Sequence, residues 1–159
     1  DINAIIVNCL AILNNKIKHK ADIEKQYCHQ AIIIKGNVGK IHEVFLNVLT
    51  NAIQALGKNG KIFVATKIDN TTAIIEIVDN GIGIDAKNIK QLTDPFFTTK
   101  PPGEGTGLGL SITYSILKEH KGTIEFESEI GKGTTVKIKL PLISSNNREM
   151  EETTYQKEF

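Results

Sequence analysis

Apolar side chains recur with the period of an α-helix in three stretches of the chain. These stretches cover residues 2–17, 41–56 and 108–120, and each gathers its apolar positions on one face. Glycine residues follow the second and third stretches, as is common where helices end. The pattern therefore predicts three amphipathic helices, each with one face against a core.

Shorter runs that are β-branched or alternate between apolar and polar residues predict strands. The five predicted strands cover residues 32–34, 61–67, 73–78, 123–129 and 134–140. The last four form two hairpins. Hairpins interspersed with helices are typical of an α+β fold, so we expect a two-layer α/β sandwich. Its sheet would be mixed but mostly antiparallel, with the helices on one face.

A long stretch rich in glycine and proline separates the two hairpins. It runs from residue 80 to about residue 107 and contains at most a short helix near residues 86–92. Loops of this length inside a compact domain are usually functional, so we expect a lid over a binding site. Residues 1–143 then form one domain, and the polar residues 144–159 form a flexible tail.

The composition narrows the class of protein. The chain has 159 residues and a formal net charge of +1. We therefore expect neither a nucleic-acid partner nor a polybasic membrane anchor, and no apolar run has the length of a membrane span. Cys9 and Cys28 stand in no metal or redox spacing, which favours reduced thiols and a cytoplasmic setting. Because the chain opens at Asp1 rather than at methionine, we expect a fragment of a longer protein.

A polar stripe interrupts the second predicted helix. Glu43, Asn47 and Asn51 follow one another at intervals of four residues and therefore share a face. Asparagine is a weak helix former, and its amide oxygen is a neutral ligand suited to Mg²⁺. The stripe indicates either a metal site or a solvated helix face. A zinc site of the His-Glu-x-x-His type is excluded, because Leu46 stands where the second histidine is needed.

A carboxylate and two glycines follow the predicted strand 73–78. Asp79 can accept a hydrogen bond from an exocyclic amino group such as that of adenine. Gly81 and Gly83 let the backbone approach a planar base closely. An ordinary turn is the alternative, which Asp-Asn-Gly also favours. The residues alone leave both interpretations open.

Two further clusters lie in the long loop. Gly103–Leu110 is rich in glycine and leads into a helix, whose first N–H groups suit a phosphate. It lacks the Gly-Lys-Ser/Thr of a Walker loop, and no strand precedes it as in a Rossmann motif. Asp94–Lys100 contains two phenylalanines suited to anchoring a mobile loop, and a lysine, Lys100, suited to reaching a phosphate. The alternative for this cluster is a buried pair of phenylalanines beside a surface lysine.

Phe-Phe-Thr-Thr-Lys at residues 96–100 and Asn-Ala-Ile-Gln-Ala at residues 51–55 look most like the nitrogen-regulator and oxygen-sensor type of kinase. The order and spacing of all the clusters resemble the ATP-binding catalytic domain of bacterial sensor histidine kinases. That domain belongs to a wider ATPase superfamily that includes gyrase and mismatch-repair ATPases. Residues 43–52 are similar to the N box, 79–84 to the first G box, 94–100 to the F box and 103–110 to the second G box. Residues 131–134 resemble the last turn of the family.

On the adenine side, the resemblance implies that Asp79 reads the base. Gly81 and Gly83 would shape the pocket around it. Ile84 and Thr134 are two further expected nucleotide contacts, and Thr134 would lie near the adenine. The long loop would then be an ATP lid.

On the phosphate side, the resemblance implies that Asn51, helped by Asn47, holds Mg²⁺ against ATP. Glu43 would be a catalytic residue that orients water or the metal, and Lys100 would add charge. The second G box would supply the contacts of Gly105, Thr106, Gly107, Leu108 and Gly109. Gln54 stands where many family members carry a basic residue, so a phosphate contact is either lost or moved to Lys100.

The resemblance also implies a reaction and partners. The γ-phosphate would pass to a histidine on a separate dimerisation domain, and a response regulator would act downstream. The four histidines of this chain stand in no acceptor context, so we expect ATP binding without efficient self-phosphorylation; they are His19, His29, His42 and His120. The chain alone would be monomeric, and it would come from a cytoplasmic protein or from the cytoplasmic part of a membrane-bound sensor.

Two alternatives to the kinase function stay open. The first is an ATPase or switch of the same superfamily that hydrolyses ATP to drive a conformational change. Those relatives usually carry an acidic residue beside the metal-binding asparagine, whereas Thr50 precedes Asn51 here. The second is a non-catalytic nucleotide-binding interaction module.

Overall fold

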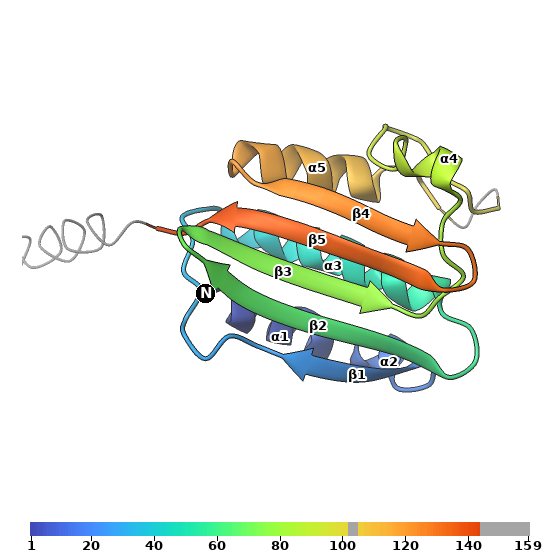
Figure 1. Ribbon diagram of the computed structural model, residues 1–159, viewed down its shortest axis with the longest axis horizontal. Helices are drawn as coiled ribbons and strands as arrows, with labels where there is room; N and C mark the ends of the chain where they lie inside the picture. Colours follow the sequence, from blue (N-terminus) through green and yellow to red (C-terminus); the bar gives the residue numbers. More distant parts are fainter. Residues whose placement is uncertain (102–104, 144–159) are drawn as a thin grey trace, which may run out of the picture.

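A five-stranded sheet and a layer of helices on one of its faces make up the protein (Figure 1). The computed structural model describes residues 1–101 and 105–143. The strands are β1 (Ala21–Gln26), β2 (Gly60–Asp69), β3 (Thr72–Asp79), β4 (Thr123–Glu129) and β5 (Gly133–Pro141). They lie in the order β1-β2-β3-β5-β4. Since β1 and β2 pair in parallel and the other pairs are antiparallel, the predicted mixed, mostly antiparallel sheet is confirmed.

Three helices of the helical layer lie behind the sheet in Figure 1, with α3 in contact with both others. They are α1 (Ile2–Ile12), α3 (Val38–Ala55) and α5 (Gly109–Glu119). The short α2 (Asn14–Ile17) and α4 (Ala86–Ile89) complete the set in the described residues, and α4 confirms the short helix expected in the long loop. Among these described helices, none is both long and apolar enough to cross a membrane.

The first predicted helix is divided into two. α1 ends at Ile12, and Leu13 forms a turn before α2 begins at Asn14. Asn14 and the asparagine after it are weak helix formers, so the buried Leu13 and Ile17 keep the apolar period although the helix does not continue.

The strand predicted at residues 32–34 is wrong. Ile32 is fully buried, but its carbonyl accepts from the N–H of Ile2, and that of Ile33 accepts from Ile143. These are single bonds to separate segments rather than a strand ladder. The first strand is instead β1, whose residues are mostly exposed. Among the strands that the structure describes, β1 pairs with β2 alone, at the edge of the sheet.

The core lies between the sheet and α3. Inward side chains of β3 alternate strictly with outward ones, and the inward row runs through Ala73, Ile75 and Ile77. The apolar face of α3 packs against this row, and its Phe45 and Leu49 are fully buried. Burying side chains of this size contributes roughly 1.5–3 kcal/mol each, which fixes α3 firmly on the sheet. The next inward position of β3 after Ile77 belongs to Asp79.

Candidate nucleotide site at the ends of α3 and β3

Asp79 places a carboxylate at the end of an apolar row. Its side chain is only 6% exposed, and its Oδ1 accepts a hydrogen bond from the N–H of Gly81 at 2.8 Å. Burial raises the pKa of this carboxyl above its ordinary value, while backbone hydrogen bonds from Gly81 and Thr134 act in the opposite direction. A buried carboxylate of this kind is costly for stability, which indicates a role in binding.

The turn after Asp79 is attached to the last residue of α3. The N–H of Ile82 donates to the carbonyl of Ala55 at 3.0 Å. A Cβ on Gly81 would lie 2.6 Å from that same carbonyl oxygen. Gly83 has a φ of +72°, and a Cβ there would lie 2.0 Å from the carbonyl oxygen of Glu129. Both positions therefore require glycine, because the turn packs closely against the backbone of Ala55 and Glu129. The sequence prediction was a close approach to a planar base, whereas the contacts in the structure are to backbone.

Ser128 joins three parts of this region and was missed by the sequence interpretation. Its Oγ accepts from the N–H of Ile84 at 2.8 Å, donates to the carbonyl of Gly133 at 2.8 Å and lies 2.9 Å from the Oγ1 of Thr134. The available signal was a hydroxyl at an inward position of β4, in line with Ile124 and Phe126. Ile84 and Thr134, both predicted nucleotide contacts, are therefore brought together by a third residue.

Asn47 connects α3 to the first turns of α5. Its Nδ2 donates to the carbonyl of Gly109 at 3.1 Å and lies 3.4 Å from the Oγ1 of the fully buried Thr113. Because the amide nitrogen is used on α5, the amide oxygen is the atom left for another partner. Glu43, one turn earlier on α3, is exposed.

Asn51 faces a cationic side chain from the long loop. The Nζ of Lys100 donates to the Oδ1 of Asn51 at 3.3 Å and also to the Oε1 of Gln54. The amide oxygen that the sequence predicts as a metal ligand is thus already directed at a positive charge. Lys100 lies beside the polar stripe of α3, although 49 residues of sequence separate it from Asn51.

The loop before α5 brings backbone N–H groups to the same place. α5 begins at Gly109, and Leu108 in front of it provides no side-chain cap, so the first N–H groups of the helix are suited to an anion. The N–H of Leu108 donates to the Oγ1 of Thr106 at 3.3 Å. Gly107 has a φ of +66°, and a Cβ there would meet the carbonyl carbon of Phe96 at 2.4 Å. Gly105 packs near Lys100, whereas Gly103 and Glu104 of the predicted loop lie outside the described residues.

The donor set at this point fits Mg²⁺ better than a transition metal. Asn47 and Asn51 offer neutral amide oxygens one turn apart, a sparse set suited to an ion that also keeps water and phosphate ligands. In the two described stretches of chain, no three His, Cys, Asp or Glu residues gather in a way that could hold a metal ion. The fit to Mg²⁺ rests on these donors.

The sequence family described as histidine kinase-, DNA gyrase B- and HSP90-like ATPase matches residues 36–144. This span includes every residue of the candidate site described above. The chain belongs to this ATPase family. ATP binding follows from that membership, and the predicted resemblance is confirmed.

The curated relatives of this ATPase domain include several bacterial sensor kinases. The chain is 38% identical over 136 residues to sporulation kinase C of Bacillus subtilis, covering 86% of this chain and 30% of that protein. It is 42% identical over 122 residues to sporulation kinase E of the same organism, covering 76% and 15%. The chain thus spans about a third or less of the length of such relatives.

Solved structures of histidine kinases share the fold. The nucleotide-free catalytic domain of histidine kinase ThkA has a TM-score of 0.79 at 30% identity, covering 88% of this chain and 93% of that one. ThkA in complex with the response regulator protein TrrA has a TM-score of 0.75 at 27% identity, covering 89% and 40%. The fold of this ATPase domain is that of a histidine kinase catalytic domain.

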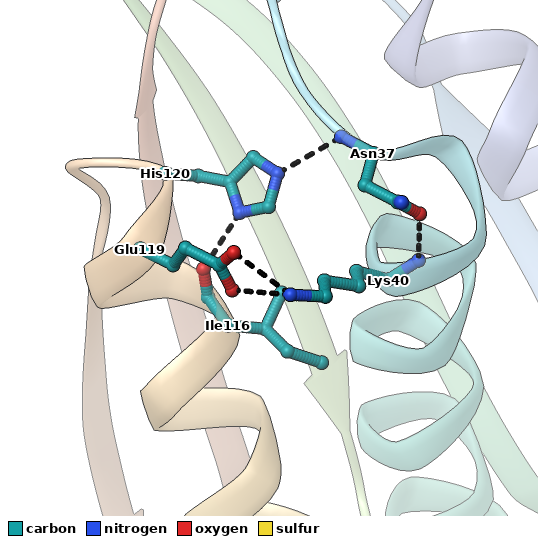
Figure 2. Close-up of polar contacts among 5 residues, drawn as sticks. All are labelled: Asn37, Lys40, Ile116, Glu119 and His120. Carbon is teal, nitrogen blue, oxygen red and sulfur yellow. Dashed lines mark hydrogen bonds and ion pairs between the residues drawn. The ribbon is translucent and has the colours of Figure 1, made fainter.

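Within the ATPase domain, α3 and α5 are joined at both ends of their contact. Asn47 bonds to the start of α5, and at the other end Lys40 of α3 pairs with Glu119 of α5 at 2.7 Å (Figure 2). His120, directly after α5, accepts a hydrogen bond from the N–H of Asn37. These links hold the loop before α5 at a fixed place relative to the asparagines of α3.

Proposed function

We propose that this ATPase domain, formed by residues 1–143, binds Mg-ATP and donates the γ-phosphate to a histidine on a separate dimerisation domain of a sensor histidine kinase. A response regulator is the proposed downstream partner. The sensor-kinase relatives and the ThkA–TrrA complex support the assignment.

The observation that carries the proposal is the attachment of two unlike binding elements to one helix. The turn that follows the buried Asp79 bonds to Ala55 at the end of α3. The start of α5, which no side chain caps, bonds to Asn47 on the same helix. The helix α3 therefore sets the distance between the proposed adenine-binding carboxylate and the proposed phosphate-binding loop.

On the adenine side, Asp79 would accept a hydrogen bond from the exocyclic amino group of the base. The hydrogen bond from Gly81 fixes the orientation of the carboxylate, and a carboxylate has room for further donors. Thr134 and Ile84 flank it through Ser128. Burial keeps competing water away and strengthens the interaction.

On the phosphate side, the N–H groups of Gly105 to Gly109 and the ammonium of Lys100 would surround the β- and γ-phosphates. The oxygens of Asn51 and Asn47 would hold Mg²⁺, which when bound neutralises charge on the phosphates. Glu43 is proposed to orient water or the metal from the exposed side of α3. The work of this domain in phosphoryl transfer is positioning and electrostatic stabilisation.

Thermal unfolding with and without Mg-ADP tests the nucleotide site first. A ligand present at 100 times its dissociation constant stabilises by about 2.7 kcal/mol, which raises the midpoint of a domain of this size by about 5–10 °C. We expect this shift in the original chain and not in Asp79→Asn. The absence of any shift at millimolar Mg-ADP contradicts the proposal.

Transfer of labelled phosphate from ATP to a supplied histidine-bearing dimerisation domain then tests the reaction. We expect label on that domain only when both proteins are present. Steady phosphate release by this chain alone would instead indicate a hydrolysing ATPase, and binding with neither reaction would indicate an interaction module.

A further inference from the structure

Lys100 rests on two amide oxygens of α3, one from Asn51 and one from Gln54. The two acceptors are three residues apart and therefore share a face of the helix. Hydrogen bonds from an ammonium group to an oxygen are stronger than those between neutral groups. The pair of oxygens, Asn51 Oδ1 and Gln54 Oε1, is called the amide seat below.

The two oxygens of the amide seat differ in what else they can bind. Asn51 is a proposed ligand of Mg²⁺, and an ammonium within 3.3 Å of its oxygen cannot stay there once a divalent cation binds the same atom, because the two cations repel each other. Gln54 is exposed, one turn further along α3. Its bond to Lys100 involves no proposed metal ligand, so this bond can persist.

We propose that Gln54 is a positioning residue for Lys100. In the ligand-free chain it holds the ammonium in the amide seat, where Lys100 occupies the cation-binding oxygen of Asn51. When Mg-ATP binds, Lys100 leaves Asn51 but stays tethered by Gln54 at the phosphate edge. Ordering the flexible side chain of Lys100 at the phosphates costs rotamer entropy. The hydrogen bond to Gln54 lowers this cost, because it already restricts the side chain before the nucleotide binds. This second half rests on the proposed function, whereas the first half does not.

Trace acylation of the ligand-free chain tests the seat itself. The chain is treated with a small amount of an N-hydroxysuccinimide ester of acetate, and the rate at each lysine is read by peptide mass spectrometry. Loss of one oxygen partner in Gln54→Leu is expected to speed acylation of Lys100 about 3- to 10-fold. Lys58 serves as the internal reference, and Gln54→Glu keeps the slow rate because it retains an acceptor oxygen.

The matched control is Gln26→Leu, which makes the same change at an exposed position of β1. It is expected to leave the rate at Lys100 unchanged. If Lys100 is acylated at the same rate in Gln54→Leu and in the original chain, Gln54 does not hold Lys100 in the amide seat. This conclusion does not depend on whether the chain binds nucleotide.

A double-mutant cycle tests the tether. The affinity for the non-hydrolysable analogue Mg-AMPPNP is measured for the original chain, Gln54→Leu, Lys100→Met and the double variant. We expect Gln54→Leu to weaken binding about 3- to 10-fold when Lys100 is present and to have no effect in Lys100→Met. Equal losses in both backgrounds overturn the positioning role. A chain that binds no nucleotide overturns the tether together with the proposed function, and the acylation rates still decide the seat.

Discussion

The backbone N–H of Asn37 donates a hydrogen bond to the Nε2 of His120 at 3.1 Å, across 83 residues of sequence (Figure 2). The other ring nitrogen, Nδ1, lies 2.7 Å from the carbonyl oxygen of Ile116. One nitrogen must accept and the other must donate, so the ring is the neutral tautomer with its proton on Nδ1. His120 therefore binds the start of α3 to the end of α5 in its uncharged form.

Removing this ring is expected to loosen the pair of helices. In His120→Ala the N–H of Asn37 loses its acceptor, while the carbonyl of Ile116 loses the ring but still accepts from the backbone N–H of residue 120. We expect a loss of about 1–2 kcal/mol in the free energy of unfolding, which lowers the midpoint by about 2–8 °C. Thermal unfolding measures it, with the exposed His19→Ala as the control. Equal midpoints for the two variants would show that water replaces both bonds at no cost.

Gly36 lies against the same ring. A Cβ at this position would come within 2.4 Å of the Cδ2 of His120, which its two hydrogen bonds prevent from moving aside. Gly36→Ala is expected to cost about 1–3 kcal/mol in the original chain and much less in His120→Ala. Denaturant unfolding of the four proteins gives the coupling. Additive losses would mean that the cost arises from the backbone at Gly36 and not from the ring.

Asp79 gives stability a dependence on pH whose sign follows from its burial. Its pKa in the folded chain is raised, so the protonated carboxyl favours the fold below the ordinary aspartate pKa of about 4. This contribution is lost as the pH rises through the folded-state pKa. At pH 7 we therefore expect ligand-free Asp79→Asn to be at least as stable as the original chain, and its advantage to shrink as the pH falls towards 4. Midpoints measured from pH 4 to pH 8 check this, and a variant that is less stable at pH 7 would show that the carboxylate stabilises the fold.

The parts of the fold that could be predicted from sequence are those with a strong local period. α3 and β3 each bury one regular row of apolar side chains, and both lie close to their predicted bounds. β1 could not be found in this way. Its residues are mostly polar and exposed, and they form a strand because β2 provides a partner, which is information held elsewhere in the chain.

The candidate site shows the same division. Asp79 and the asparagines of α3 stood out because a polar group at a buried position or inside a helix needs a reason. Gln54 and Ser128 did not stand out as contacts, since both are ordinary surface or strand residues until the fold brings Lys100 and Ile84 to them. Motifs identify the residues that face a ligand, whereas tertiary structure identifies the residues that hold them in place.

Ser128 is expected to support the turn after Asp79. In Ser128→Ala the N–H of Ile84 loses its acceptor in a half-buried position, so we expect a loss of about 1–3 kcal/mol in the free energy of unfolding and weaker binding of Mg-ADP. Ser115→Ala is the matched control, because that exposed hydroxyl donates to the carbonyl of Ser111 within its own helix. Urea unfolding and isothermal titration measure the two effects, and equal behaviour of both variants would contradict a supporting role.

A chain can need glycine because the backbone has a positive φ or because a Cβ would clash with a neighbour. Gly83 and Gly131 allow these two reasons to be measured separately. Both have a positive φ, of +72° and +79°, so an alanine at either position is strained by about 1–2 kcal/mol. At Gly131 a Cβ would meet nothing within 4 Å, whereas at Gly83 it would lie 2.0 Å from the carbonyl oxygen of Glu129. Because that neighbour is backbone, it cannot turn aside as a side chain would.

We therefore expect Gly83→Ala to cost about 2–5 kcal/mol in the free energy of unfolding, and Gly131→Ala only the conformational part. The two variants share the change and the sign of φ, so their difference measures the crowding between the turn and β4. Urea unfolding of both gives that difference. If it is close to zero, the turn relaxes away from β4, and Mg-ADP affinity should then fall in Gly83→Ala, because Asp79 and Ile84 at the two ends of the turn would shift with it.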